Sequence, residues 1–459
     1  MFQWKLQDSR RYTAWGLGVL AVIGLVWWLS PGMPVIIGPW AWSGQAERGQ
    51  ELFAHEWTAH DPFAGGDGLG PVFNATSCAS CHFQGGLGGA GETRGDVRHY
   101  MVRETRQNPS ADGMIHAGSV SKEFQESFSL LRTLYPVLKG STRRERTGHC
   151  EYTVTIPDFD PVRVESINAT ALFGAGWIDL ISSKAIKHQQ FSQTFSGTWV
   201  ELTKAQFDIK PLGKARILSD GRVGKFGWKA QFATLEEFVA SACANELGLS
   251  TPIKDQPRPM GNATYVSTGV DMSWRQLRDM SAFVSTLPRP VEVLPAESDL
   301  AALAVQGKKL FKSVGCASCH VPDLGGVSGV YSDFLLHDVI SRLDGSGGGG
   351  GGGGYGGDPE PADLPERSPG EPLPNEWKTP PLWGVASSAP YMHDGSAKTL
   401  EIAILQHKGD ATVVTQAYRK LSKDDQRAVV EFLKTLQAPG NVPPASPAPV
   451  VKPGMVAQR

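Results

Sequence analysis

Apolar residues along this chain recur with a helical period more often than they alternate as in a strand. The clearest helical series comprises Leu235, Phe238, Val239 and Ala242. Such spacing places apolar side chains on one face of a helix. Strand-like alternation is sparse, and we expect only a small β insertion near residues 152–165. The high contents of glycine (53) and proline (32) indicate long loops between short helices. The pattern therefore predicts a mainly α fold.

The longest apolar run, residues 12–29, contains no charged residue and is long enough for a transmembrane helix. Lys5, Arg10 and Arg11 precede it, which by the positive-inside bias places the N-terminus in the cytoplasm. A cleaved signal peptide is the alternative, but the small-x-small site at residues 41–43 lies well past the apolar run. We expect an uncleaved anchor in the inner membrane, and both interpretations place the rest of the chain on the periplasmic side.

The formal net charge of the chain is -2 at pH 7, and no basic run is interleaved with aromatic residues. A protein that binds nucleic acid needs a positive surface to neutralise phosphates. We therefore exclude nucleic acid as a partner.

Four of the 6 cysteines lie in two Cys-x-x-Cys-His motifs. The motifs comprise Cys78, Cys81 and His82, and Cys316, Cys319 and His320. Two thiols at this spacing reach both vinyl groups of one haem, and the adjacent histidine approaches the iron as an axial ligand. A zinc ribbon or a thioredoxin-like thiol pair would leave the histidines unexplained. We predict two covalently bound c-type haems, haem one on the first motif and haem two on the second, with His82 and His320 as metal ligands.

The two remaining cysteines are Cys150 and Cys243. Cysteines in an oxidising compartment pair more often than they stay free, so we expect a disulfide between them. Two unrelated buried thiols are the alternative.

Three short motifs occur twice in the same order, once with each haem motif. They are Gly-x-x-Leu-Phe at 49–53 and 307–311, Leu-aromatic-Gly at 172–174 and 382–384, and Thr-Leu-Glu at 234–236 and 399–401. An ordered set of repeats indicates duplication of one haem-binding domain. The expected division is an anchor at 1–43, a first haem domain at 44–290, a second at 291–440 with a glycine-rich insert at 346–357, and a disordered proline-rich tail at 441–459.

Longer motifs carry a resemblance to a known family. They lie at 67–74 (Asp-Gly-Leu-Gly-Pro-Val-Phe-Asn), 224–230, 331–338, 376–384 and 391–395 (Tyr-Met-His-Asp-Gly). Over roughly residues 49–436 the chain resembles the di-haem oxidoreductase family, which is related to the bacterial di-haem cytochrome c peroxidases. The resemblance implies two cytochrome c-like haem domains. The predicted fold class is therefore mainly α, with two such domains, long loops and an N-terminal transmembrane helix.

The resemblance also implies a distal ligand for haem two. In the related peroxidases this ligand, usually methionine, lies about four helical turns past the histidine of the Tyr-x-His-Asp-Gly motif. Counted from His393 through the helix that begins at Thr399, that place is held by His407. Two histidine ligands would give haem two a lower potential than a histidine and a methionine, because imidazole stabilises Fe(III) better than a thioether does.

The corresponding place in the first half holds a residue that cannot bind iron. When Thr234 is aligned with Thr399, Ala242 falls at the position of His407. Haem one then lacks a ligand from this helix and is expected to be the reactive haem. The alternative is a ligand from elsewhere in the chain, for which His116 is the best candidate.

Two catalytic residues are expected from the same resemblance. The related peroxidases carry a distal glutamate near the place of Glu246, which would move a proton between the two oxygens of a peroxide. A solvated carboxylate at a helix end is the alternative. Trp228 falls near the inter-haem tryptophan of those enzymes and would relay electrons; a packed core residue is the alternative.

These observations favour a peroxidase in which haem one reacts and haem two stores an electron. The expected partners are H₂O₂ or a similar small oxidant, the membrane, and an electron-donor protein or a quinol-linked chain. A non-catalytic di-haem electron-transfer cytochrome of a membrane respiratory chain is the main alternative, and an O₂-dependent oxygenase is a third. The sixth ligand position of haem one distinguishes them, because two fixed strong ligands would favour the carrier.

Overall fold

A computed structural model describes residues 44–457 apart from 93–94, 96, 104–109, 148–149, 204–211, 341–371, 374 and 446–450. The predicted anchor at 1–43 and the glycine-rich insert at 346–357 lie outside the described residues. Within them, no helix is both long enough and apolar enough to cross a membrane.

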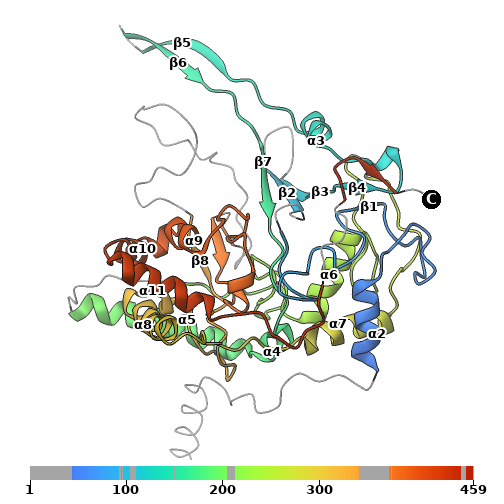
Figure 1. Cartoon of the computed structure of the whole chain (residues 1–459). Helices are drawn as coiled ribbons and strands as arrows, with labels where there is room; N and C mark the ends of the chain where they lie inside the picture. The colour runs from blue at the N-terminus through green and yellow to red at the C-terminus, as the bar shows by residue number, and fades with distance from the viewer. Residues whose placement is uncertain are drawn as a thin grey trace, which may run out of the picture.

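The helices form two groups that lie on opposite sides of the molecule (Figure 1). The first group comprises α2 (Gln45–Ala54), α4 (Ala175–Leu180), α6 (Leu235–Leu247) and α7 (Trp274–Thr286). The second comprises α8 (Ser298–Val314), α9 (Leu400–Gln406), α10 (Thr412–Arg419) and α11 (Lys423–Lys434). Two further helices are α3 (Phe128–Leu134) and α5 (Ser183–Thr203). Each group contains one Cys-x-x-Cys-His motif, which is separated from the end of α8 by one residue in the second group and from the end of α2 by residues 55–77 in the first.

The repeated Gly-x-x-Leu-Phe motif marks the same helix crossing in both groups. Gly49 on α2 lies against α7, where an added Cβ would stand 1.9 Å from the carbonyl oxygen of Asp279. Gly307 on α8 lies against α11, where an added Cβ would stand 1.8 Å from the carbonyl oxygen of Ala428. Only glycine permits backbones to approach this closely. The match between the two crossings supports the duplication that the sequence indicates.

The prediction of a mainly α fold is wrong, because four small sheets accompany the helices. Their strand orders are β1-β4-β10, β3-β2-β7, β5-β6 and β8-β9. The strands are β1 (Val72–Phe73), β2 (Val97–Val102), β3 (Ala111–Ile115), β4 (Gly118–Ser119), β5 (Ser141–Thr147), β6 (Cys150–Ile156), β7 (Val162–Ile167), β8 (Leu336–Asp338), β9 (Glu376–Lys378) and β10 (Met455–Val456). The β insertion expected near 152–165 is present as β6 and β7, but it belongs to a larger β region that begins at β2.

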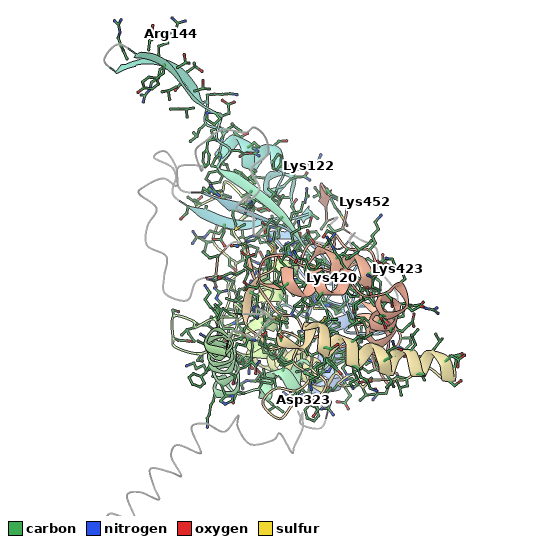
Figure 2. The ribbon with its side chains drawn as sticks, turned by 90° about the vertical axis from the view of Figure 1, so that its left-hand side faces the viewer. Lys122, Arg144, Asp323, Lys420, Lys423 and Lys452 are labelled. Atoms are coloured by element: carbon green, nitrogen blue, oxygen red, sulfur yellow. The ribbon has the colours of Figure 1, made fainter. Side chains whose placement is uncertain are left out.

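The reason for the error lies in the composition of the β region. Strand β2 carries Arg98, His99 and Tyr100, and its residues are only half-buried until Val102. A strand without a fully buried face shows little of the alternation by which strands are recognised. Strands β5 and β6 form a hairpin that stands away from the rest of the molecule (Figure 1). Arg144 lies far out along it, whereas Lys122 lies near its base (Figure 2).

The largest core fills the first helix group and extends beyond it. Besides α2, α6 and α7 it includes Leu324, Phe334 and Trp383 from the predicted second domain, and Val451 from the predicted tail. A smaller core lies between α8, α10 and α11. The domain boundaries therefore stay a prediction, since the larger core joins residues from both halves.

The prediction of disorder is wrong for the end of the tail. Val451 is buried, and Met455 and Val456 in β10 pair in parallel with Gly118 and Ser119 in β4. The C-terminal segment thus returns to the first half of the chain, close to the first Cys-x-x-Cys-His motif.

Candidate haem sites

Both haem motifs place their two thiols and one imidazole within a single turn. The backbone N–H of His82 donates to the carbonyl of Cys78 over 3.0 Å, and that of His320 to the carbonyl of Cys316 over 3.0 Å. None of the four motif cysteines is in a disulfide. Their sulfur atoms are thus available for thioether bonds to a haem.

The two proximal histidines are oriented in the same way. Nδ1 of His82 lies 3.0 Å from the carbonyl oxygen of Gly89, and Nδ1 of His320 lies 3.0 Å from that of Tyr331. A carbonyl can only accept, so each Nδ1 carries the proton and each Nε2 keeps its lone pair. Such a hydrogen bond from the ring nitrogen that does not face the metal is the usual way in which a protein fixes the tautomer of a metal-binding histidine.

Burial keeps both imidazoles neutral, which is the form that binds iron. It lowers the pKa of His82 below its ordinary value and that of His320 to about 4. The phenylalanine of each Gly-x-x-Leu-Phe motif lies beside the histidine, with ring centroids 6.2 Å apart for Phe53 and His82 and 6.4 Å apart for Phe311 and His320. The proximal sides of the two sites are therefore nearly the same.

His407 lies where it could serve haem two. Helix α9 begins at Thr399, whose hydroxyl accepts from the N–H of Ile402, and His407 caps its C-terminus. Nδ1 of His407 lies 2.7 Å from the carbonyl oxygen of Ala403, which leaves Nε2 free. Burial lowers the pKa of His407. The pKa of His320 is lowered mainly by burial, and a positive charge on His407 lowers it further. The two rings therefore lie near each other inside the second half.

The matching helix of the first half offers no imidazole. Helix α6 begins at Thr234 with a reciprocal hydrogen-bonded cap from Glu237, and it continues past Ala242 to Leu247. Cys243 and Glu246, farther along α6, lie near Cys78. Burial is the largest cause of the raised pKa of the Cys78 thiol, and negative charges on Cys243 and Glu246 raise it further. Helix α6 thus directs a carboxyl group, not a histidine, toward the first motif.

Glu246 is held by a neighbouring amide. Its Oε2 accepts a hydrogen bond of 3.0 Å from Nδ2 of Asn74, and Oδ1 of Asn74 accepts one of 3.1 Å from the N–H of Ala117. Burial raises the pKa of Glu246 above its ordinary value, and the hydrogen bond from Asn74 opposes that rise. A carboxyl group whose pKa lies nearer neutrality is suited to accepting and returning a proton.

The predicted disulfide between Cys150 and Cys243 is wrong. Cys243 is a free, buried thiol in the main core, and burial raises its pKa to about 12. Cys150 begins strand β6 of the projecting hairpin. The sequence could not show that the two residues lie in separate parts of the molecule.

His116 is not free to bind iron in this structure. Its Nδ1 lies 2.8 Å from Oε2 of Glu126, and its Nε2 lies 3.1 Å from the carbonyl oxygen of Asn245. Both ring nitrogens therefore face hydrogen-bond acceptors. In this structure the alternative distal ligand of haem one is thus engaged in hydrogen bonds on both ring nitrogens.

Trp228 lies where segments of the two halves meet. Its Nε1 donates to the carbonyl of Asn168 over 2.9 Å. Its ring centroid is 6.3 Å from that of His393 and 6.5 Å from that of Trp377. Lys229 places its Nζ 3.5 Å from the centroid of the Trp377 ring. This position suits an electron relay between the halves, although it would equally suit a packing role.

Several buried polar groups fit the presence of haem. Lys378 is 7% exposed, burial lowers its pKa to about 8, and among the described residues no carboxylate forms an ion pair with it. The indole N–H groups of Trp377 and Trp383 are buried without a hydrogen-bond partner. Buried cations and donors need anionic or accepting partners. The carboxylates of a haem would supply such partners.

A second buried pair supports the haem-two motif. Nε2 of His337 lies 2.9 Å from Oδ2 of Asp333, and Nδ1 of His337 lies 3.9 Å from Sγ of Cys319. The three side chains lie close enough to hold a metal ion. A thioether at Cys319 would remove the thiolate that such an ion needs, so the pair is better explained as support for the haem attachment.

Sequence reasoning assigned no role to Asn74, Glu126 or Lys378. Asn74 and Lys378 lie inside motifs that carry the family resemblance, which is the signal that could have found them. Glu126 lies in no motif, and only its contact with His116 reveals it.

Comparison with known proteins confirms the family resemblance. A family model described as "Di-haem oxidoreductase, putative peroxidase" matches residues 369–436, which contain β9 and His407. Cytochrome c551 peroxidase of Nitrosomonas europaea is 31% identical over 138 residues, which are 29% of this chain and 33% of that protein. The match thus spans about a third of that relative. The family match covers residues 369–436, at the end of the second half of the chain.

Two solved structures are distantly similar. Hydrazine synthase of Kuenenia stuttgartiensis has a TM-score of 0.34 at 17% identity, over 59% of this chain and 73% of that chain. A MauG-like protein associated with microbial copper homeostasis has a TM-score of 0.29 at 21% identity, over 48% of this chain and 71% of that chain. Neither likeness is close enough to add to the functional assignment.

Proposed function

We propose that this chain is a c-type di-haem peroxidase, with haem one as the reactive haem and haem two as an electron reservoir. Cys78, Cys81 and His82 would hold haem one. Cys316, Cys319 and His320 would hold haem two, with His407 as its distal ligand. The reaction is H₂O₂ + 2 H⁺ + 2 e⁻ → 2 H₂O, with both electrons drawn from an external one-electron donor.

The observation that carries this proposal is the difference between α6 and α9. Both helices begin at a threonine cap, but α9 ends on His407 near His320, whereas α6 presents Glu246 near Cys78. A haem with two strong ligands transfers electrons, and a haem with an open side can bind a peroxide. The match of the family model to residues 369–436 and the partial likeness to a cytochrome c551 peroxidase support a di-haem peroxidase.

Haem would supply the redox-active iron and its affinity for peroxide. Glu246 would accept the proton of the peroxide oxygen nearer the iron and return it to the outer oxygen. This proton transfer by Glu246 would favour heterolytic cleavage of the O–O bond, with the outer oxygen leaving as water. Asn74 keeps one carboxylate oxygen of Glu246 in a fixed position through its 3.0 Å hydrogen bond.

Electrons would enter from a donor protein or a quinol-linked chain and reach haem one from haem two. Trp228 would relay them, since it lies at the junction of the two halves. Haem attachment through Cys-x-x-Cys-His motifs favours a periplasmic location.

The test is peroxide turnover by the holoprotein in its half-reduced state, with haem content measured on the same sample. Two haems per chain and peroxide-dependent oxidation of a reduced donor are expected. Two low-spin haems that do not react with peroxide, cyanide or CO when half-reduced would replace the peroxidase with an electron carrier.

A further inference from the structure

A buried ion pair lies behind the proposed distal side of haem one. His116 is 5% exposed and Glu126 is 7% exposed. Oε2 of Glu126 accepts from Nδ1 and from the backbone N–H of His116, both over 2.8 Å. Oε1 of Glu126 accepts from the N–H of Met260 over 2.7 Å. Glu126 thus accepts from two backbone N–H groups in addition to its contact with the imidazole.

The second ring nitrogen of His116 fixes the charge of the imidazole. Nε2 lies 3.1 Å from the carbonyl oxygen of Asn245, which can only accept a hydrogen bond. Nδ1 faces a carboxyl oxygen and Nε2 faces a carbonyl, so both ring nitrogens lie against hydrogen-bond acceptors. This geometry fits an imidazolium ion whose charge Glu126 balances.

This imidazolium contacts the residue directly before Glu246. The carbonyl of Glu246 also accepts from the N–H of Asn74 over 2.7 Å, so the end of α6 is tied to the loop after β1. Burial raises the pKa of Glu246, and the hydrogen bond from Asn74 and the positive charge of His116 oppose that rise. The groups that face Glu246 from other elements are Asn74, the sulfur of Cys78, and His116, which is backed by Glu126. Cys243 lies on α6 itself.

If His116 and Glu126 served only to hold their loop against α6, neither side chain would need to be charged. A neutral amide could satisfy the carbonyl of Asn245 at a lower cost, since two charges removed from water lose their hydration. A positive charge near the carboxyl group of Glu246, which must exchange protons, would explain why the pair is charged.

We infer that His116, together with Glu126, is a positioning residue for the peroxide reaction, which holds Glu246 in place and keeps its carboxyl group ionised at neutral pH. The inference rests on the proposed function. Glu246 can accept the proton of H₂O₂ only as a carboxylate, so turnover must rise with pH through its pKa. Loss of the positive charge would raise that pKa, and the rising limb of the pH profile would move to higher pH.

The main test variant replaces both partners, His116→Gln with Glu126→Gln. The double substitution removes both charges together, which avoids leaving one of them buried and unpaired. His116→Lys keeps the positive charge beside Glu126. His55→Gln is the matched control, because His55 forms a 2.9 Å contact with Asp61 in the same half of the chain and is not among the groups that influence Glu246.

Two measurements on the holoprotein are compared. One is the pH profile of peroxide turnover. The other is the infrared C=O band of the protonated Glu246 carboxyl group, identified by its absence in Glu246→Gln, followed as the pH changes. The double variant should move both midpoints to higher pH by on the order of one unit, as expected for loss of a nearby opposite charge. His116→Lys should move them much less, and His55→Gln should leave them unchanged.

An infrared midpoint that stays in place in the folded, haem-loaded double variant would overturn the inference. Equal shifts in His116→Lys and in the double variant would also overturn it, because hydrogen bonding and not charge would then be responsible. Absence of turnover in the unaltered protein would instead refute the proposed function, and with it any catalytic role for the pair, even if the infrared midpoint moved.

Discussion

The two halves of this chain share a proximal side and differ on the distal side. In each half a glycine permits a close helix crossing, a phenylalanine lies beside the motif histidine, and Nδ1 of that histidine donates to a carbonyl over 3.0 Å. On the distal side, helix α9 ends on His407, whereas α6 continues past Ala242 and carries Glu246.

On the proposed function, this difference would give a duplicated domain two roles with little change in its framework. The proximal contacts attach the haem and orient its ligand, so both copies need them. The distal helix decides whether the iron is closed by a strong ligand or left open to a peroxide. On the proposed function, one change of residue, histidine against alanine at the same register, would separate an electron reservoir from a reactive site.

The largest effect is expected from removal of one attachment site. Cys78→Ala with Cys81→Ala should lose one haem of two in a pyridine haemochrome assay, because no thioether can form there. Cys316→Ala with Cys319→Ala should lose the other haem, and the remaining spectrum should differ between the two variants. Retention of both haems in either variant would remove the basis of the comparison.

Replacement of the distal carboxyl group should affect only one half. Glu246→Gln should reduce peroxide turnover by roughly 10²–10⁴-fold, the usual contribution of a positioned proton carrier. Both haem spectra should stay nearly unchanged, because no iron ligand is lost. Glu236→Gln, in the first turn of the same helix, is the control and should retain turnover. Full activity in Glu246→Gln would remove this residue from the mechanism.

The shared helix crossings should be equally sensitive in the two halves. Gly49→Ala and Gly307→Ala would each place a Cβ less than 2 Å from a backbone oxygen. Each should lower the free energy of unfolding of the holoprotein by about 3 kcal/mol, the upper part of the range for overpacking. Gly440→Ala, with nothing within 4 Å of the added Cβ, should have no such effect. If alanine left the free energy of unfolding unchanged at one crossing and not at the other, the two helix crossings would not be equivalent.

A smaller effect is expected from the C-terminal segment, in which β10 pairs with β4 of the first half. Ending the chain after Ala445 removes buried Val451 and strand β10. Loss of the valine should lower the free energy of unfolding by about 1.5 kcal/mol. The haem-two spectrum should be unaffected. Unchanged denaturant unfolding of the truncated protein would show that the segment contributes nothing to stability.

The sequence predicted the parts of this molecule that depend on local chemistry. The Cys-x-x-Cys-His motifs, and the threonine caps at Thr234 and Thr399, can be recognised from a few adjacent residues, and the structure contains both helix starts. The place of His407 followed from its distance along the chain to the family motif. Its role as a ligand stays a prediction.

Features that depend on distant contacts could not be predicted. Strand β2 pairs with β3 and β7, but its polar, half-buried residues give no strand signal. Glu126 gains its importance only because folding places it against His116. The error over Cys150 and Cys243 has the same origin, since no local pattern shows that a hairpin carries one cysteine away from the core.

The asymmetry between the haems is tested most directly by magnetic circular dichroism of the ferric holoprotein, native and His407→Ala. The native protein should show one low-spin haem with two histidine ligands and one high-spin haem. His407→Ala should convert the low-spin haem to high spin and slow peroxide turnover by removing the reservoir. Two low-spin haems in the native protein, or a low-spin signal that survives His407→Ala, would contradict the account.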